Sequence, residues 1–321
     1  MRWRCICWGL GVIRVLVLEK HKSKIVMIIC LVQKIGCEKM KSISPLRYPG
    51  GKSNLYDYIK SVIEENNLQN YTYAELFAGG AGVAIALLLN GEVKNIVIND
   101  YDYCIYSFWH SVLNDTENLC RLILNADITI AEREYHKQIY SNFENHTMLE
   151  VGFATLFLNR TNRSGILQGG VIGGKEQNGI YKMDCRFNKR EIITRINNIA
   201  AKKAHISLYN SDASEFLRIQ SEQLKKWSFF YLDPPYVVKG GNLYKNSFQH
   251  SDHKELASIV KKRLKDRKWI ITYDKVDLIE QLYSEFEKKH YDLTYTAQEK
   301  KKGSEVMIFS KTLKIPQNEI I

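Results

Sequence analysis

Residues 71–100, YTYAELFAGGAGVAIALLLNGEVKNIVIND, decide the fold of this chain. The apolar pattern predicts a buried strand over 71–77, a helix over 82–90 and a second strand over 95–98, with glycines in the first turn. Strand, helix and strand in this order are typical of a mainly parallel sheet that carries helices on its faces. The sequence therefore predicts an α/β fold.

The same alternation returns in the second half of the chain. Its predicted elements are strands over 205–208, 227–232 and 269–273 and helices near 252–264 and 276–285. The last two predicted strands, 291–295 and 305–310, are joined by the charged turn QEKKKG, so we expect the sheet to end in an antiparallel hairpin.

The segment between Asp100 and Asp233 is longer than two strand-helix units of ~30 residues each would need. We place an insert at 114–200, with two or three helices that include 149–160, then a loop over 161–185 with six glycines, then a helix from Asn188. A loop of that length inside a compact domain is usually functional or disordered.

The first 39 residues differ from the rest of the chain. They hold eight basic and two acidic side chains, and so contribute +6 of the net charge of +11. Their apolar runs, 5–18 and 25–32, are shorter than the ~20 residues of a membrane span, and no small-residue cleavage site follows the first run. We expect a dispensable extension and a start at Met40, and no membrane association.

Composition excludes several classes of protein. With 45% hydrophobic residues, the chain of 321 residues is too apolar to be disordered. Its seven cysteines are odd in number and include no C-x-x-C pair, which argues against a disulfide scaffold or a zinc site. We therefore expect no metal, and a reducing compartment such as the cytoplasm.

The turn Phe77-Ala-Gly-Gly-Ala-Gly82 has the composition of a nucleotide-binding loop. Glycines let the backbone turn tightly and approach a ligand, and the following helix N-terminus offers unpaired N–H groups. Asp100, at the end of the next strand, is placed to accept hydrogen bonds from ribose hydroxyls. The pattern departs from G-x-G-x-x-G at Ile85. The turn and Asp100 together indicate an adenosine-type ligand, which could be a nicotinamide dinucleotide or S-adenosylmethionine. Alternatively, the glycines serve only the close packing of the strand against the helix.

The stretch RYPGGKS, 47–53, is not a Walker phosphate loop. Leu46 stands where that loop needs glycine, and Ser44-Pro45 argues against a preceding strand. The structural alternative is a Pro-Gly turn before a helix, with Ser53 as the N-cap.

The stretch Phe229-Phe-Tyr-Leu-Asp-Pro-Pro-Tyr236 indicates the chemistry. It puts an acid, two prolines and an aromatic ring at the carboxyl end of a buried strand, where α/β sheets bind ligands. Prolines fix the backbone, so the Asp233 carboxylate and a neighbouring carbonyl form rigid acceptors. Two acceptors that hold the hydrogens of an exocyclic amine would stabilise the charge that develops as its nitrogen attacks an electrophile. Tyr236 can stack on a base that has left the duplex.

At this point the sequence resembles a known family, the adenine-N6 DNA methyltransferases of the Dam-like D12 class. The resemblance runs over nearly all of 40–321 and rests on motifs in the family's order: RYPGGK (47–52), AELFAGGAG (74–82), IND (98–100), FLNR (157–160), NSD (210–212), DPPY (233–236) and YKNSFQHSDH (244–253). The order of glycine motif, recognition insert and DPPY is the family's alpha arrangement. Two local departures are Tyr48-Pro49, where some members have Trp and a small residue, and the Gly-rich recognition loop, so the target site cannot be carried over.

The resemblance implies a Rossmann-like fold that uses S-adenosyl-L-methionine as cofactor and methylates the N6 amine of a flipped adenine in double-stranded DNA. It implies cofactor contacts from Tyr48, Lys52, Phe77, Gly79, Asp100, Asp212 and Asp233, and catalytic roles for Asp233, Pro234 and Tyr236. It divides the chain into a cofactor half (40–113), a target-recognition insert (114–200) and a catalytic half (201–321). A cognate restriction enzyme is a partner that the resemblance allows; it does not set the oligomeric state.

Basic residues bracket the glycines of the insert and are candidates for DNA contact. They are Arg160, Arg163, Lys175, Lys182, Arg186 and Lys189. The run KKRLKDRK, 261–268, is more typical of a solvated helix face than of a DNA patch. Lys300–Lys302 fit either interpretation.

Two other hypotheses remain open at the level of sequence. An N4-cytosine, RNA or protein-amide methyltransferase would use the same acceptor geometry. A DNA-binding module with an inactive methylation centre is the alternative from another class, and the intact set Tyr48, Lys52, Asp100 and Asp233 argues against it.

Overall fold

The computed structural model describes residues 2–8, 11–17, 43–47, 52–220, 222, 224, 227–237, 248–295 and 301–321. The chain divides into two compact units, Met1–Met40 and Lys41–Ile321. In the first unit, β1 (Arg2–Trp8) pairs antiparallel with β2 (Gly11–Val17), a hairpin that the sequence pattern did not predict.

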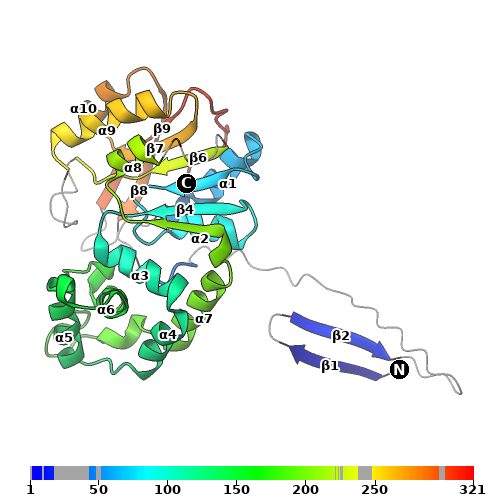
Figure 1. The fold of residues 1–321 in the computed structure, drawn as a ribbon, viewed down its shortest axis with the longest axis vertical. Coiled ribbons are helices and arrows are strands. Elements are labelled where there is room, and N and C mark those ends of the chain that lie inside the picture. The colour runs from blue at the N-terminus through cyan, green and yellow to red at the C-terminus, as the bar shows by residue number, and fades with distance from the viewer. Residues whose placement is uncertain are drawn as a thin grey trace, which may run out of the picture. The chain divides into compact units, whose positions relative to one another are not determined.

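The second unit is built on a seven-stranded sheet with the strand order β5-β4-β3-β6-β7-β9-β8 (Figure 1). Its strands are β3 (Thr72–Glu75), β4 (Asn95–Asn99), β5 (Ile206–Tyr209), β6 (Ser228–Leu232), β7 (Lys268–Asp274), β8 (Glu287–Tyr295) and β9 (Lys301–Phe309). Strands β3 to β7 run parallel, whereas β9 is antiparallel to both β7 and β8. The predicted α/β fold and its terminal hairpin are confirmed.

The strand order reverses between β3 and β6. The chain runs outward from β3 through β4 to β5, returns to pair β6 with β3, and then continues in the opposite direction. In open α/β sheets, ligands bind in the crevice outside the carboxyl ends of the strands at such a point. The glycine-rich turn after β3 and the segment 233–237 after β6 both lie at this edge.

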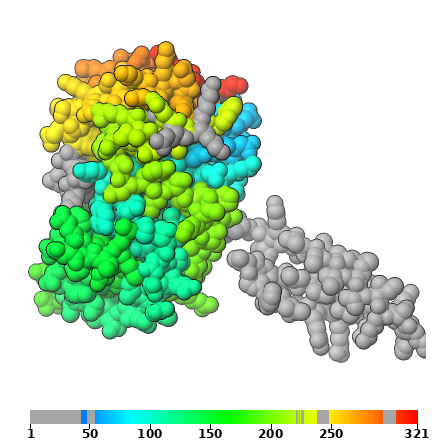
Figure 2. All heavy atoms as spheres, in the orientation of Figure 1, coloured from blue at the N-terminus to red at the C-terminus, as the bar shows by residue number. Residues whose placement is uncertain are grey.

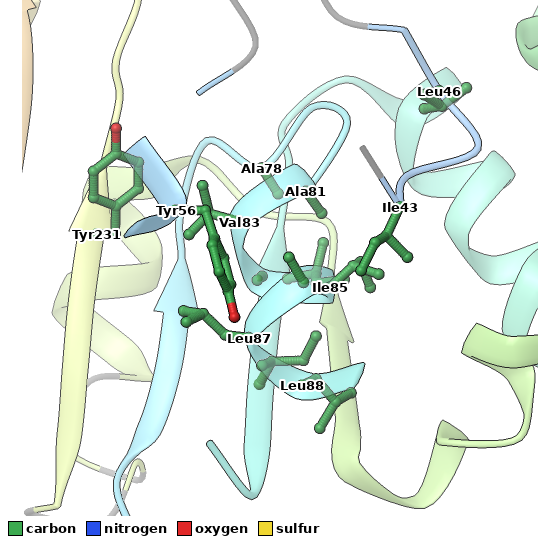
Figure 3. Packing of buried hydrophobic residues seen from close by; sticks show 14 of the residues in the cluster. Ile43, Leu46, Tyr56, Ala78, Ala81, Val83, Ile85, Leu87, Leu88 and Tyr231 are labelled. Carbon is green, nitrogen blue, oxygen red and sulfur yellow. The ribbon is translucent and has the colours of Figure 1, made fainter. Parts of the chain in front are cut away.

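Alternate residues of the strands pack into two cores, one on each face of the sheet. On β6, Phe229 and Tyr231 belong to one core and Phe230 and Leu232 to the other. The helices α1 (Tyr56–Glu65), α2 (Gly82–Leu89) and α3 (Tyr103–Asn114) contribute to the first core, and α8 (Ala213–Ile219), α9 (His250–Arg263) and α10 (Asp277–Leu282) to the second. Figure 3 shows part of the first core, where side chains of α2 lie with those of Ile43 and Leu46. Burial on both faces explains why β6 is a continuous apolar run.

The segment predicted as an insert forms a group of helices at one end of the unit (Figure 1). They are α4 (Thr116–Asn125), α5 (Ile130–Ser141), α6 (Met148–Thr161) and α7 (Lys189–Ala200). Thr129, Thr147 and Asn188 cap three of them by accepting a hydrogen bond from the backbone N–H three residues later. Every residue of 151–161 is buried, so α6 is the central helix of the group.

Ser53 is not the N-cap of the first helix. It lies inside the 3₁₀ turn Lys52–Leu55, and α1 begins only after Leu55, which supplies no side-chain cap. In the part of the chain that the structure describes, no helix combines the length and the apolar character that a membrane crossing requires.

Candidate active site

The glycine turn after β3 is held in a tight, left-handed conformation. Gly79 and Ala81 have φ values of +48° and +45°, a region that costs little for glycine and on the order of 1 kcal/mol for alanine. The indole Nε1 of the fully buried Trp109, on α3, donates to the Gly79 carbonyl at 2.9 Å. A β-carbon on Gly82 would meet no described heavy atom within 4 Å, which leaves the start of α2 open to a ligand.

Asp100 lies against this turn, as the sequence predicted. Its Oδ2 accepts a hydrogen bond from the Gly79 N–H at 2.7 Å, and its Oδ1 accepts one from the Asp102 N–H at 2.9 Å. Burial, with a smaller contribution from Asp102, raises the pKa of Asp100 to about 7. The carboxyl group therefore ties the ends of β3 and β4 together at the mouth of the crevice.

Glu75, at the end of β3, is an acidic residue that the motif analysis did not single out. Its buried Oε1 accepts hydrogen bonds from the Ala84 N–H at 3.0 Å and from the Tyr73 hydroxyl at 3.2 Å. Burial raises the pKa of Glu75 to about 8, and nearby Asp233 adds to the effect. The sequence predicts that the N–H groups at the start of α2 are available to a ligand. The Ala84 N–H is not, because it donates to Glu75.

Asp212 lies at the same edge, after β5. Its Oδ1 caps α8 by accepting from the N–H groups of Ser214 at 2.8 Å and Glu215 at 3.0 Å. Asn99, buried at the end of β4, donates to the Ser211 carbonyl at 3.0 Å and accepts from its N–H at 3.1 Å, which fixes the turn before Asp212.

Asp233 stands at the carboxyl end of β6, beside β3 and β7. Its Oδ1 accepts a hydrogen bond of 2.7 Å from the hydroxyl of Thr272 on β7. Pro234 is buried, and the Val237 N–H donates to the buried Asp274 at 3.0 Å. Side chains of β7 therefore hold both ends of the segment 233–237.

Tyr236 points its hydroxyl at the hairpin. Burial, followed by the charge of Asp233, raises the pKa of Tyr236 well above its usual value, and its hydroxyl is hydrogen-bonded to Glu305 on β9. Glu305 also accepts from the Tyr291 hydroxyl at 2.7 Å. The hydrogen bond from the Tyr236 hydroxyl to Glu305 therefore fixes the orientation of the Tyr236 ring, which is predicted to stack on the base.

Phe77 connects the glycine turn with the chain before α9. Its ring meets that of Phe248 edge to face, with centroids 5.8 Å apart, and Phe248 lies 5.3 Å from the buried ring of His253 at the start of α9. Of the other two predicted cofactor residues, Tyr48 lies outside the described residues, and Lys52 is described in its backbone only.

The segment 43–47, which leads into RYPGGK, is held by the insert. The Asn159 side chain accepts from the Arg47 N–H at 2.7 Å and donates to the Arg47 carbonyl at 2.6 Å. Arg195 on α7 donates to the Ser44 carbonyl at 2.8 Å. The FLNR motif therefore anchors the chain in front of the first cofactor motif.

Arg160 is not placed for contact with DNA. Its guanidinium is buried and donates to the carbonyls of Pro45 and Arg186, and burial lowers its pKa to about 10. It ends the central helix α6, so its neighbours are core residues rather than solvent. The prediction that Arg160 contacts DNA is corrected on this ground.

The other predicted DNA-binding residues lie on the surface of the insert. Four of them are exposed: Arg163, Lys175, Lys182 and Arg186. Lys189 is partly buried and donates to the Leu124 carbonyl at 2.9 Å. Figure 2 shows the outer surface of the insert in green. The glycine-rich loop of the insert also exposes Ile180 and Tyr181, which are 96% and 68% accessible and line a shallow hollow together with Arg163.

The loop that carries Ile180 and Tyr181 is organised by Gln177. Its Nε2 donates to the carbonyls of Ile172 at 2.8 Å and Gly174 at 2.6 Å, and its Oε1 accepts from the Met183 N–H at 2.9 Å. The glycines allow this loop to fold on itself, because a β-carbon on Gly173 would lie 2.7 Å from the Tyr181 carbonyl. Sequence reasoning found the glycines but missed Gln177.

The basic run at the end of α9 is engaged with neighbouring acids. Lys261 forms an ion pair with Glu285 at 2.9 Å, and Arg263 pairs with Glu222. This agrees with the interpretation as a solvated helix face.

Comparison with known proteins identifies the family. The family model for D12 class N6 adenine-specific DNA methyltransferases matches residues 48–297. The chain belongs to this family. The D12 class assignment confirms the resemblance seen in the sequence, with S-adenosylmethionine as methyl donor and DNA as substrate.

Solved structures that resemble this D12 methyltransferase are distant in sequence. A Pyrococcus horikoshii protein assigned as an RNA methyltransferase is 11% identical over 83% of this chain and 86% of its own, with a TM-score of 0.39. The rRNA methyltransferase AviRa of Streptomyces viridochromogenes is 9% identical over 81% and 84%, with a TM-score of 0.36. TrmK of M. capricolum, in complex with S-adenosyl-homocysteine, is 8% identical over 78% and 68%, with a TM-score of 0.34. A search of curated proteins gives no match.

Proposed function

We propose that this D12 methyltransferase methylates the N6 amine of an adenine that has been flipped out of double-stranded DNA, with Asp233 and the Pro234 carbonyl as acceptors for the amine hydrogens. The observation that carries the proposal is the place of Asp233, which follows β6 at the switch point of the sheet, next to β3 and therefore on the same edge as the glycine turn. A duplex base cannot reach that depth without leaving its stack.

S-adenosylmethionine, when bound, supplies an electrophilic methyl group on a sulfonium centre. The residues present fit such a ligand, because Asp100 and Asp233 place oxygen acceptors at the carboxyl edge of the sheet, and the open space at Gly82 leaves the start of α2 accessible. We propose that Asp100 holds the ribose hydroxyls and that Gly79 gives close backbone approach. Phe77 and Asp212 would border the adenine ring, and Tyr48 and Lys52 the methionine part.

The chain's own catalytic work is positioning and charge stabilisation. Asp233 and the Pro234 carbonyl would grip the N6 amine, draw its nitrogen toward tetrahedral geometry and stabilise the positive charge on it in the transition state. Tyr236 would stack on the adenine. The proton released from the amine passes to Asp233 or to solvent.

We propose that the insert 114–200 selects the target site. Its exposed cations, Arg163, Lys175, Lys182 and Arg186, would neutralise phosphates and reach into a groove, with Ile180 and Tyr181 between them. The enzyme would act in the cytoplasm, where its DNA and methyl donor occur together.

A labelling experiment tests this function. The full chain is incubated with radiolabelled S-adenosylmethionine and unmethylated duplex DNA, and the DNA is digested to nucleosides and separated. We expect label in N6-methyl-2′-deoxyadenosine released from the DNA. Label in N4-methylcytosine, or label that appears only when RNA replaces DNA, would overturn the proposal.

A further inference from the structure

Thr272 and Asp233 come from adjacent strands and meet at the end of β6. The Thr272 side chain is fully buried on β7, and its Oγ1 lies 2.7 Å from Asp233 Oδ1. The same Oγ1 lies 3.0 Å from the hydroxyl of Tyr231, which is also buried. Parallel pairing of β6 with β7, with Leu232 opposite Ile271, brings the next residues of the two strands together.

The direction of these hydrogen bonds follows from the number of protons. The Thr272 hydroxyl has a single proton, which it donates to Asp233 Oδ1. Thr272 Oγ1 must then accept from Tyr231. The order Tyr231 to Thr272 to Asp233 is a directed chain, in which the first donation strengthens the second.

We propose that Thr272 is a positioning residue for methyl transfer. Its donation to Oδ1 fixes the rotation of the Asp233 carboxylate, so that the group meets the amine in one orientation. This inference rests on the proposed role of Asp233. Accurate placement matters, because an error of about 1 Å in a reacting group can cost about 100-fold in rate.

The test compares Thr272→Val with Thr272→Ser in the full chain. Valine keeps the shape and removes the hydroxyl, whereas serine keeps the donor. We expect Thr272→Val to lower the single-turnover rate of methyl transfer about 10- to 100-fold, with the dissociation constants for S-adenosylmethionine and DNA within about twofold of wild type. Thr272→Ser should restore most of the rate.

Thr155→Val is the matched control. Thr155 is also fully buried, but its hydroxyl donates to the Val151 carbonyl within α6. Its loss should change the unfolding midpoint without changing the transfer rate. Equal rates for Thr272→Val and wild type would overturn the inference, as would a rate loss that Thr272→Ser shares in full.

Asp233→Ala distinguishes a failure of the positioning role of Thr272 from a failure of the acceptor role of Asp233. If Asp233→Ala is inactive while Thr272→Val is fully active, the positioning role fails and the proposed function stands. If Asp233→Ala keeps wild-type turnover, the acceptor role of Asp233 and the positioning role of Thr272 both fail, while the labelling experiment still decides whether adenine is the methylated base.

Discussion

The side-chain amide of Asn159 and the backbone of Arg47, 112 residues apart in the chain, exchange two hydrogen bonds of 2.7 and 2.6 Å. The same amide donates to the Gly165 carbonyl at 2.9 Å. One residue at the end of α6 thus holds both the start of the first cofactor motif and the start of the glycine-rich loop. The proposed recognition insert and the proposed cofactor site share this contact.

Asn159→Ala should therefore weaken both stability and cofactor binding. It removes three hydrogen bonds and leaves buried backbone groups without partners, a loss of about 2–4 kcal/mol. We expect a lower urea midpoint and weaker binding of S-adenosylmethionine in calorimetric titration. Asn118→Ala is the control, since Asn118 is exposed and bonds only locally to Asp115. A midpoint equal to that of the control would contradict the prediction.

The order of elements and the edge that carries the site could be predicted from sequence, because both depend on local pattern. Carboxyl ends of parallel strands meet at one edge, so Asp100 and Asp233 had to lie at the same edge of the sheet. The partners that hold them could not be predicted. Trp109 and Thr272 reach Gly79 and Asp233 from other elements, and nothing in their local sequence marks the contact.

Arg160 shows a different failure of sequence reasoning. It lies in the last turn of α6, and residues 151–161 of this helix are all buried. The mainly apolar sequence of residues 151–159 is the signal for this burial. The basic residues that follow, from Arg163 to Arg186, do lie on the surface.

Asp233→Ala should abolish methyl transfer while sparing both ligands. Loss of a preorganised acceptor for the reacting amine should lower the rate about 1,000-fold. DNA binding, measured by fluorescence anisotropy, should stay within about threefold of wild type, because phosphate contacts supply most of the affinity. Wild-type turnover in this variant would remove Asp233 from the catalytic role.

Substitutions of Arg160 and Arg163 should have different effects, the first on the stability of the fold and the second on DNA binding. Arg160→Met loses buried hydrogen bonds to two carbonyls and should destabilise the protein by about 2–4 kcal/mol in urea unfolding. Arg163→Ala, at an exposed site, should leave the unfolding midpoint unchanged and weaken DNA binding. The slope of log affinity against log salt should fall by about 1 for a lost phosphate contact. The reverse pattern would place Arg160 at the DNA.

Glu75 should make the stability of the cofactor-free protein depend on pH. Its pKa is about 8 in the folded protein against an ordinary 4.5, so between these values the folded state holds a proton that the unfolded state has lost. Stability should fall as pH rises through this window, by up to ~1.4 kcal/mol per pH unit from this group. Glu75→Gln keeps the acceptor for Ala84 and Tyr73 but cannot ionise. Urea unfolding from pH 5 to 8 should show a flatter profile for this variant, with a residual slope from Asp100.

Trp109→Phe tests whether the hydrogen bond from the Trp109 indole stabilises the glycine turn. The change removes the 2.9 Å hydrogen bond to the Gly79 carbonyl and part of the ring that fills the core beneath the turn. We expect a loss of stability together with about tenfold weaker binding of S-adenosylmethionine, the equivalent of about 1.4 kcal/mol. Trp269→Phe is the matched control, because Trp269 is equally buried but belongs to the core on the other face of the sheet.

The two tryptophan variants should lose similar stability, since each exchanges a fully buried indole for a smaller ring. Only Trp109→Phe should lose cofactor affinity, because only Trp109 touches the turn whose backbone shapes the crevice. Equal affinity in both variants would mean that β3, Asp100 and α2 hold the turn without it. The left-handed φ of Gly79 and Ala81 favours a loss of cofactor affinity in Trp109→Phe alone, because a strained turn persists only where its surroundings fix it.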